Sequence, residues 1–411
     1  MQRNWRVGSL FGIPLNLDPS WFYILLLLTW LNASRWDRLY SGWGTATAWG
    51  AGFLLALALF ASVVLHELGH SLVARAQGIR VQSITLFLFG GIASLDRESR
   101  TPGQAFQVAI AGPLVSLGLF LVFAAVGTRL LEDTPPYVIT RELSIVNLVL
   151  GLFNLVPGLP LDGGQVLKAL VWKLTGSPFQ GVRWAARSGE LLGSLAMGLG
   201  VFLFLVTRDP IAGLWLGLLG WFGYSNAQSY RRLTNLQEIL LQATARDVMD
   251  REFRVLPAEM PLRDFVDLHL LPHDRPPVFF ADRDGRYLGL VKPDALQALD
   301  RGRWEVETLA TLVKPLAEIP TVSEGTVLAQ VILTLEEAPA GRVTVLTPAG
   351  GVAGLVDWAD VLQALAREVV LPAGELQRIK QEGQYNNANQ LAALARRVLE
   401  MEAAQKGSAP D

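Results

Sequence analysis

The sequence predicts a multi-domain protein in which a polytopic α-helical membrane domain, with about six transmembrane helices and a short β-hairpin, precedes an α/β cytoplasmic domain pair. Charged residues make up 18% of the 411 residues, against about 25% in soluble domains. The deficit is confined to the first part of the chain, and the second part repeats one order of motifs twice. We expect a membrane domain, a linker, a repeated domain and a C-terminal helix with a tail at 1–230, 231–243, 244–370 and 371–411.

Composition excludes several classes of function. A net charge of -2 gives no reason to expect a nucleic-acid partner. The absence of cysteine excludes thiol nucleophiles, iron–sulfur clusters and cysteine-based zinc sites. A metal site must therefore use carboxylates or the four histidines, which are His66, His70, His269 and His273.

Six uncharged apolar segments predict the transmembrane helices, because a helix needs about 20 apolar residues to cross the bilayer. The first is short and depends on Trp21 and Trp30 lying at the interfaces. The last two are separated by a break short enough for a tight hairpin. The segments are Pro19 to Ala33, Gly44 to Leu65, Ala105 to Gly127, Leu143 to Leu161, Leu191 to Thr207 and Ile211 to Asn226.

The distribution of lysine and arginine predicts the orientation. Positive charge is denser before the first segment, in every second loop and after the sixth segment. Such loops face the cytoplasm, so we expect a multi-pass protein of the cell membrane with both termini cytoplasmic. The N-terminus does not resemble a cleavable signal peptide, because its polar stretch is long and no small-residue cleavage site follows.

Residues 81–95 are rich in β-branched and aromatic residues around Gly90 and Gly91. This pattern predicts a β-hairpin or a membrane-dipping loop. It is either an ordinary connection between two spans or a strand whose edge binds an unwound substrate, with Gly90 and Gly91 as substrate-binding residues.

The segment from His66 to His70 reads His-Glu-Leu-Gly-His, directly after an apolar run. On a helix the two imidazoles share one face and can hold one Zn²⁺, with Glu67 placed to act as a general base. Accidental matches occur on exposed helices of soluble proteins. Ionisable groups next to a membrane span are costly and usually functional, which favours a metal site.

A catalytic zinc takes three protein ligands. We expect His269 and His273 to be surface histidines, so the third ligand should be an acidic residue of the membrane part. Asp162 stands out, because it ends a segment in which two prolines break the helix and glycines allow close backbone approach. The alternative is that Asp162 caps the following helix.

HELGH at 66–70 and NLVPGLPLDGG at 154–164 together resemble the site-2 protease family of intramembrane zinc metalloproteases. The resemblance covers about residues 1–230 and is closest to the six-span subgroup that includes the pro-sigma-factor-processing sporulation protease. It implies one zinc ion held by His66, His70 and Asp162, Glu67 as catalytic base, and Asn154 as a residue that helps hold the substrate carbonyl.

Three further residues of the membrane part receive structural interpretations. Gly112 and Gly118 predict close helix packing. Glu190, at the start of the fifth span, is expected to be a solvated carboxylate at the membrane interface, and burial near the substrate gate is the alternative.

The repeat at 244–370 resembles a pair of CBS domains, carried by Arg246-Asp-Val-Met249 and by the two Gly-Leu-Val strand ends at 289–291 and 354–356. The resemblance implies regulation by ATP or another adenine nucleotide, with Lys292 and Asp360 as nucleotide-binding residues. Asp357 replaces the family's hydroxyl residue, so a purely structural pair that forms a homo-oligomer is the alternative.

The hypothesis that accounts for most of these features is a zinc endopeptidase. It hydrolyses a peptide bond within or next to a transmembrane segment of a membrane protein substrate. A non-catalytic membrane nucleotide sensor is the alternative, and a gated transporter is a third. Neither of these needs Glu67 or the proline-broken segment before Asp162.

Overall fold

The computed structural model describes residues 5–87, 90–207, 210–273, 277–366, 385 and 388–406, which divide into two compact units. The first unit ends at Thr234 and the second begins at Asn235. A multi-domain chain with a helical membrane part and a later α/β part is therefore confirmed.

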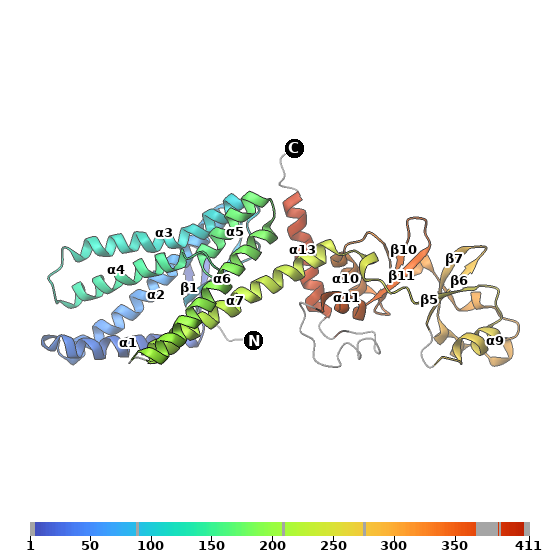
Figure 1. Ribbon diagram of the computed structural model, residues 1–411, viewed down its shortest axis with the longest axis horizontal. Helices are drawn as coiled ribbons and strands as arrows, with labels where there is room; N and C mark the ends of the chain where they lie inside the picture. Colours follow the sequence, from blue (N-terminus) through green and yellow to red (C-terminus); the bar gives the residue numbers. More distant parts are fainter. Residues whose placement is uncertain are drawn as a thin grey trace. The chain divides into compact units, whose positions relative to one another are not determined.

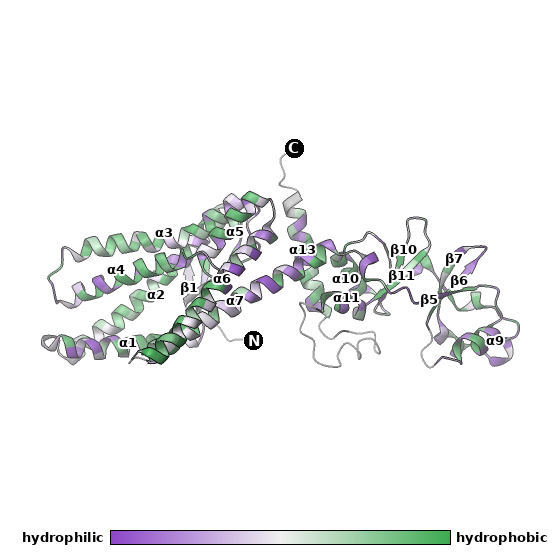
Figure 2. Ribbon diagram, in the orientation of Figure 1, coloured by the Kyte–Doolittle hydropathy of each residue, from purple (hydrophilic) through white to green (hydrophobic). Residues whose placement is uncertain are grey.

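The first unit is built on long helices (Figure 1). They are α1 (Ser20–Leu39), α2 (Thr45–Ala76), α3 (Pro102–Gly127), α4 (Pro135–Asn154), α5 (Asp162–Thr175), α6 (Pro178–Val206) and α7 (Pro210–Gln242). Helices α2, α3, α4 and α6 are long and apolar enough to cross a membrane. Figure 2 shows hydrophobic colour along α2, α3 and the first part of α7.

Helices occupy all six positions at which spans are expected. Helices α1 and α7 are long enough to span, but their composition is less apolar than that of the other four. The last turns of α1 carry Arg35, Asp37 and Arg38, and α7 becomes polar after Tyr224. The expected fourth span was placed too late. Helix α4 runs from Pro135 to Asn154 and ends before the prolines, which cannot continue it.

A four-stranded sheet accompanies the helices of the first unit, in the order β1-β2-β3-β4. The strands are β1 (Trp5–Leu10), β2 (Ile13–Leu17), β3 (Val81–Phe87) and β4 (Gly90–Leu95). Strands β3 and β4 pair antiparallel, which confirms the expected hairpin, and β2 joins β3 in parallel. Strand β4 lies at one edge of this sheet, so one row of its backbone groups has no neighbouring strand within the part of the chain that the structure describes.

The second unit contains two similar sheets. In the first, β5 (Phe253–Pro257) runs parallel to β6 (Val278–Arg283), which pairs antiparallel with β7 (Arg286–Val291), and β8 (Val313–Pro315) completes the sheet. In the second, β9 (Thr321–Ser323) runs parallel to β10 (Arg342–Leu346), which pairs antiparallel with β11 (Val352–Asp357). The same order of strands in both halves agrees with the predicted two-fold repeat.

Helices complete the second repeat. They are α10 (Leu328–Glu337) and α11 (Trp358–Leu365), and both contribute to one apolar core. The last helix, α13 (Ala388–Lys406), buries Leu391, Ala395 and Val398 in the same core. Of the expected C-terminal helix and tail at 371–411, residues 371–384, 386, 387 and 407–411 lie outside the described residues. The expected linker forms the last turns of α7, which is helical to Gln242.

Candidate metal centre

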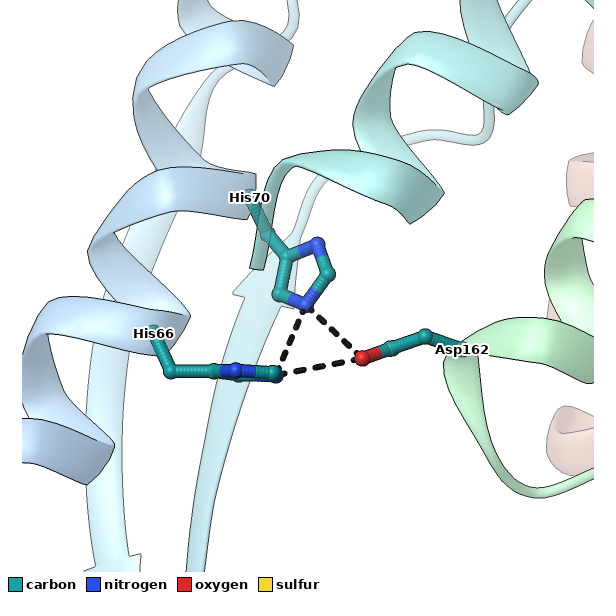
Figure 3. A group of neighbouring side chains, drawn as sticks. All are labelled: His66, His70 and Asp162. Atoms are coloured by element: carbon teal, nitrogen blue, oxygen red, sulfur yellow. Dashed lines mark hydrogen bonds and ion pairs between the residues drawn. The ribbon is translucent and has the colours of Figure 1, made fainter. Parts of the chain in front are cut away.

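Two helices of the first unit bring three ligand atoms together. Helix α2 continues without interruption through His66 and His70, so that both imidazoles leave the same face one turn apart. Asp162 is the first residue of α5 and comes to the same point from 92 positions further along the chain than His70. Figure 3 shows the three side chains converging from these two helices.

The distances within this cluster are uniform. The Nε2 atom of His66 lies 3.1 Å from Oδ2 of Asp162, and Nε2 of His70 lies 3.3 Å from the same oxygen. The two Nε2 atoms are 3.3 Å apart. Ligand atoms that each lie about 2.0–2.1 Å from a tetrahedral zinc stand roughly 3.3 Å from one another. The donor set and its spacing therefore fit this ion.

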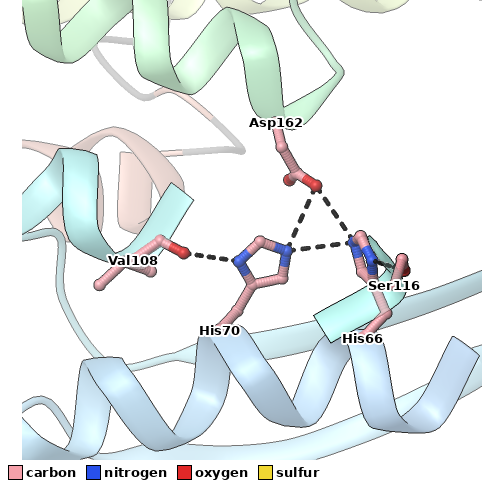
Figure 4. A network of polar contacts seen from close by, with 5 residues as sticks. All are labelled: His66, His70, Val108, Ser116 and Asp162. Carbon is pink, nitrogen blue, oxygen red and sulfur yellow. Dashed lines mark hydrogen bonds and ion pairs between the residues drawn. The ribbon is translucent and has the colours of Figure 1, made fainter. Parts of the chain in front are cut away.

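The other ring nitrogens are occupied by helix α3 (Figure 4). Nδ1 of His70 lies 2.7 Å from the carbonyl oxygen of Val108. A carbonyl only accepts, so Nδ1 carries the proton and Nε2 of the neutral ring keeps its lone pair for a metal. Nδ1 of His66 lies 2.8 Å from the buried Ser116 hydroxyl, which can accept in the same way.

Gly112 of α3 leaves room beside these nitrogens. A Cβ atom at this position would lie 2.1 Å from Nε2 of His70 and 2.7 Å from Nε2 of His66. The expectation that Gly112 permits close helix packing is confirmed, because α3 approaches the histidines of α2 closely only without a side chain at this position. The same expectation is wrong for Gly118, since a Cβ there would meet nothing within 4 Å.

Two glycines give the segment before Asp162 its compact form. A Cβ on Gly163 would lie 2.3 Å from the Leu155 carbonyl oxygen, and one on Gly164 would lie 2.4 Å from the Leu159 nitrogen. The chain thus folds back tightly on the first turn of α5. Asp162 makes no capping hydrogen bond to that turn, and its carboxylate faces the histidines instead. The alternative role of Asp162, as a cap of the following helix, is therefore not found in the structure.

Glu67 faces the open edge of the sheet. A Cβ on Gly91 of β4 would lie 2.6 Å from Cγ of Glu67, and the backbone N–H of Ala93 hydrogen-bonds to the Glu67 carboxylate. The edge strand and the Glu67 side chain are thus in direct contact, next to the histidines of the same helix. Gly90 has a φ of 133°, a backbone conformation that favours glycine.

Asn154 and Glu190 have different surroundings. Asn154 is the half-buried last residue of α4, and its side chain has no hydrogen bond among the described residues. The expectation of a solvated Glu190 is wrong, because its side chain is 14% exposed and lies 3.1 Å from Nη1 of Arg231 on α7. The carboxylate is buried because α7 covers this part of α6, which sequence alone does not reveal.

The remaining histidines lie in the second unit. His269 stacks on Phe265 and packs against Phe279, so it is half-buried against an aromatic cluster rather than on an open surface. Because His269 belongs to the second unit, His66 and His70 are the imidazoles of the candidate metal centre.

The two residues expected to bind nucleotide, Lys292 and Asp360, do not share the cavity that Asp360 lines. A cavity of about 420 Å³ includes Asp360 in its lining, together with three further acidic residues, which are Asp247, Asp250 and Glu252. Lys292 is not among the lining residues. Asp357 caps α11 and exchanges hydrogen bonds with Asp360. Burial, with the neighbouring Asp357 and Asp250 carboxylates, raises the pKa of Asp360 to about 7.

Known proteins are similar to this chain along most of its length. Peptidase family M50 matches residues 54–140 and 138–192, and the CBS domain family matches residues 245–297. Protein sll0528 of Synechocystis sp. is 42% identical, over 89% of this chain and 96% of its own length. Rip3 of Mycobacterium tuberculosis is 32% identical, over 87% of this chain and 92% of its own length.

A solved structure of a site-2 protease from Methanocaldococcus jannaschii is 32% identical, covering 56% of this chain and 95% of that chain, with a TM-score of 0.40. The names of sll0528 and Rip3 both describe zinc metalloproteases. The chain belongs to the site-2 proteases of peptidase family M50 and carries a CBS domain. It is accordingly a membrane metalloendopeptidase, as the two sequence motifs predicted.

Proposed function

We propose that this protein hydrolyses a peptide bond within or next to a transmembrane segment of a membrane protein, using one zinc ion held by His66, His70 and Asp162. The observation that carries the proposal is the convergence of three ligand atoms within 3.3 Å of one another. Glu67 lies on the same helix as the two histidines, and its side chain contacts the edge strand β4. Zinc supplies a Lewis acid and a water of lowered pKa when bound.

The chain's own residues then have separate roles. Glu67 takes the proton from the attacking water, since its carboxylate lies on the same helix as the two histidines. Val108 and Ser116 hold the imidazole rings in the tautomer that presents Nε2. Asn154, at the end of α4, is proposed to donate a hydrogen bond to the scissile carbonyl as substrate enters.

The substrate is proposed to bind as an extended strand along β4. Carbonyl groups of a transmembrane helix are hydrogen-bonded internally, so a substrate must unwind before attack. The free edge of β4 offers backbone partners to an unwound segment. Gly90 and Gly91 are the proposed substrate-binding residues, and the missing side chain of Gly91 leaves room for Glu67 against β4. The strand would therefore lie alongside the catalytic carboxylate.

The experiment that tests the proposed activity compares wild type with Glu67→Gln in lipid nanodiscs. We expect the variant to bind one zinc per chain and to lose cleavage of a transmembrane reporter by at least about 1,000-fold, because amide cannot accept the proton. Glu132→Gln, an exposed acid in the loop after α3, is the matched control and should cleave normally. Undiminished cleavage in Glu67→Gln would leave the non-catalytic sensor as the better account.

We further propose that the CBS pair modulates the protease, that both termini are cytoplasmic and that the pair forms homo-oligomers. The acidic lining around Asp360 repels a free triphosphate, so a nucleotide such as ATP would bind there only as its magnesium complex. Lys292 would act at a separate point. A purely structural pair is the alternative.

A further inference from the structure

Lys168 is a buried charged residue of the first unit that neither the proposed catalytic chemistry nor the metal centre uses. It lies on α5, six residues after Asp162, which places the two residues about 9 Å apart along the helix axis. Its side chain is 9% exposed. Burying an ammonium group costs free energy unless the group is paired. The partner of Lys168 therefore indicates the role of this residue.

The partner comes from the segment that follows the edge strand. Nζ of Lys168 lies 2.5 Å from Oε2 of Glu98. Glu98 stands three residues after the end of β4 and four before the start of α3. The Lys168 ammonium holds the pKa of the Glu98 carboxyl below its ordinary range, so the carboxylate is charged at neutral pH. The ion pair therefore connects the end of β4 with α5.

Each of the two connected elements contributes one part of the proposed catalytic site. Helix α5 carries Asp162, and β4 carries the free edge beside Glu67. The backbone of Lys168 is packed closely against α6, since a Cβ on Gly181 would lie 2.5 Å from the Lys168 carbonyl oxygen. Lys168 thus has a fixed backbone from which it holds the segment after β4.

We propose that the Lys168–Glu98 ion pair is a positioning device that holds the substrate-binding edge of β4 in register with the metal ligand Asp162. This inference rests on the proposed function. Neither residue touches the reacting atoms. Their contribution is to keep the bound strand at the distance from the metal ligands at which its carbonyl can react.

The test measures KM and kcat for a transmembrane reporter with Lys168→Met, Glu98→Gln and the double variant. We expect each to raise KM about tenfold, the double variant to be no worse than the singles, and kcat and zinc content to stay near wild type. Lys168→Met keeps the buried methylene packing and leaves Glu98 in a 66% exposed position, so it should fold normally. Glu98→Gln leaves a buried charge unpaired and should be the less stable of the two.

A second measurement does not depend on turnover. Hydrogen exchange of the amides at 90–101 should become faster in Lys168→Met, and a peptide substrate should bind more weakly when Lys168→Met is combined with Glu67→Gln. Arg35→Met removes the Arg35–Glu142 pair, 3.4 Å apart between α1 and α4, and should change neither. It is the matched control for loss of an ion pair.

The outcomes separate the two proposals. An unchanged KM and unchanged exchange in Lys168→Met and Glu98→Gln would overturn the positioning role. Parallel loss of kcat, zinc and stability would also overturn it, because a merely structural pair behaves in that way. Undiminished cleavage by Glu67→Gln would instead overturn the proposed function, whatever the ion-pair variants do.

Discussion

Single residues of α2, α3 and α5 determine what the candidate metal centre can hold. The motif His-Glu-Leu-Gly-His identified His66, Glu67 and His70 from spacing alone, because a helix places positions i and i+4 on one face. The partners on α3 could not be identified in the same way. Ser116 and Gly112 have no distinctive spacing, and their contacts arise only when α3 packs against α2.

Gly112→Ala tests the space beside the ligand nitrogens. The added methyl would lie 2.1 Å from Nε2 of His70, so we expect zinc binding to weaken by at least about 100-fold, the upper range for changes beside metal ligands. Zinc affinity by competition with a chelator measures the effect. Gly118→Ala is the control on the same helix, where a Cβ meets nothing. It should keep zinc and stabilise α3 by up to about 1 kcal/mol. Equal zinc affinity in both variants would contradict the assignment of Gly112.

At the scale of elements, the helix with the motif and the hairpin at 81–95 were predictable because both depend on local sequence. The sheet of four strands was not. Strands β1 and β2 are short, and β2 joins β3 through a parallel pairing across more than 60 residues, which no local pattern reports. The late placement of the fourth span had a similar cause, since its apolar run continues past the prolines that end α4.

Gly91→Ala tests the role of β4. The added methyl would lie 2.6 Å from Cγ of Glu67 and would push this side chain away from β4. We expect cleavage of a transmembrane reporter to fall about tenfold or more while zinc content changes little. Gly103→Ala, at the start of α3 in open space, is the control. Replacement of Gly90 and Gly91 together should show the same imbalance. Equal losses of cleavage and zinc would remove the substrate-strand interpretation.

At the scale of the whole molecule, the change in composition near residue 230 predicted two parts, and the structure divides at Thr234 and Asn235. The repeat in the second part was visible because its turns and strand ends recur in order. The packing of α13 on the second repeat could not be predicted, because an amphipathic pattern shows which face of a helix is apolar but not which surface covers it.

Nucleotide binding is a prediction for the intact protein. ATP should bind full-length protein in nanodiscs with magnesium present and not with EDTA, because four acidic residues line the cavity that includes Asp360. Asp360→Ala should weaken the binding, which calorimetry can measure. Lys314→Ala, on β8, serves as a control outside that lining. Binding of free ATP that is insensitive to Asp360→Ala would exclude this cavity as the nucleotide site.

The central claim is that two distant segments of one chain form a single catalytic zinc site. Zinc stoichiometry and reporter cleavage of Asp162→Ala, measured in one preparation beside wild type, test it most directly. We predict one zinc per chain in wild type, and in Asp162→Ala a loss of zinc at matched free concentration together with a loss of cleavage. Normal zinc content with normal cleavage in Asp162→Ala would contradict the claim.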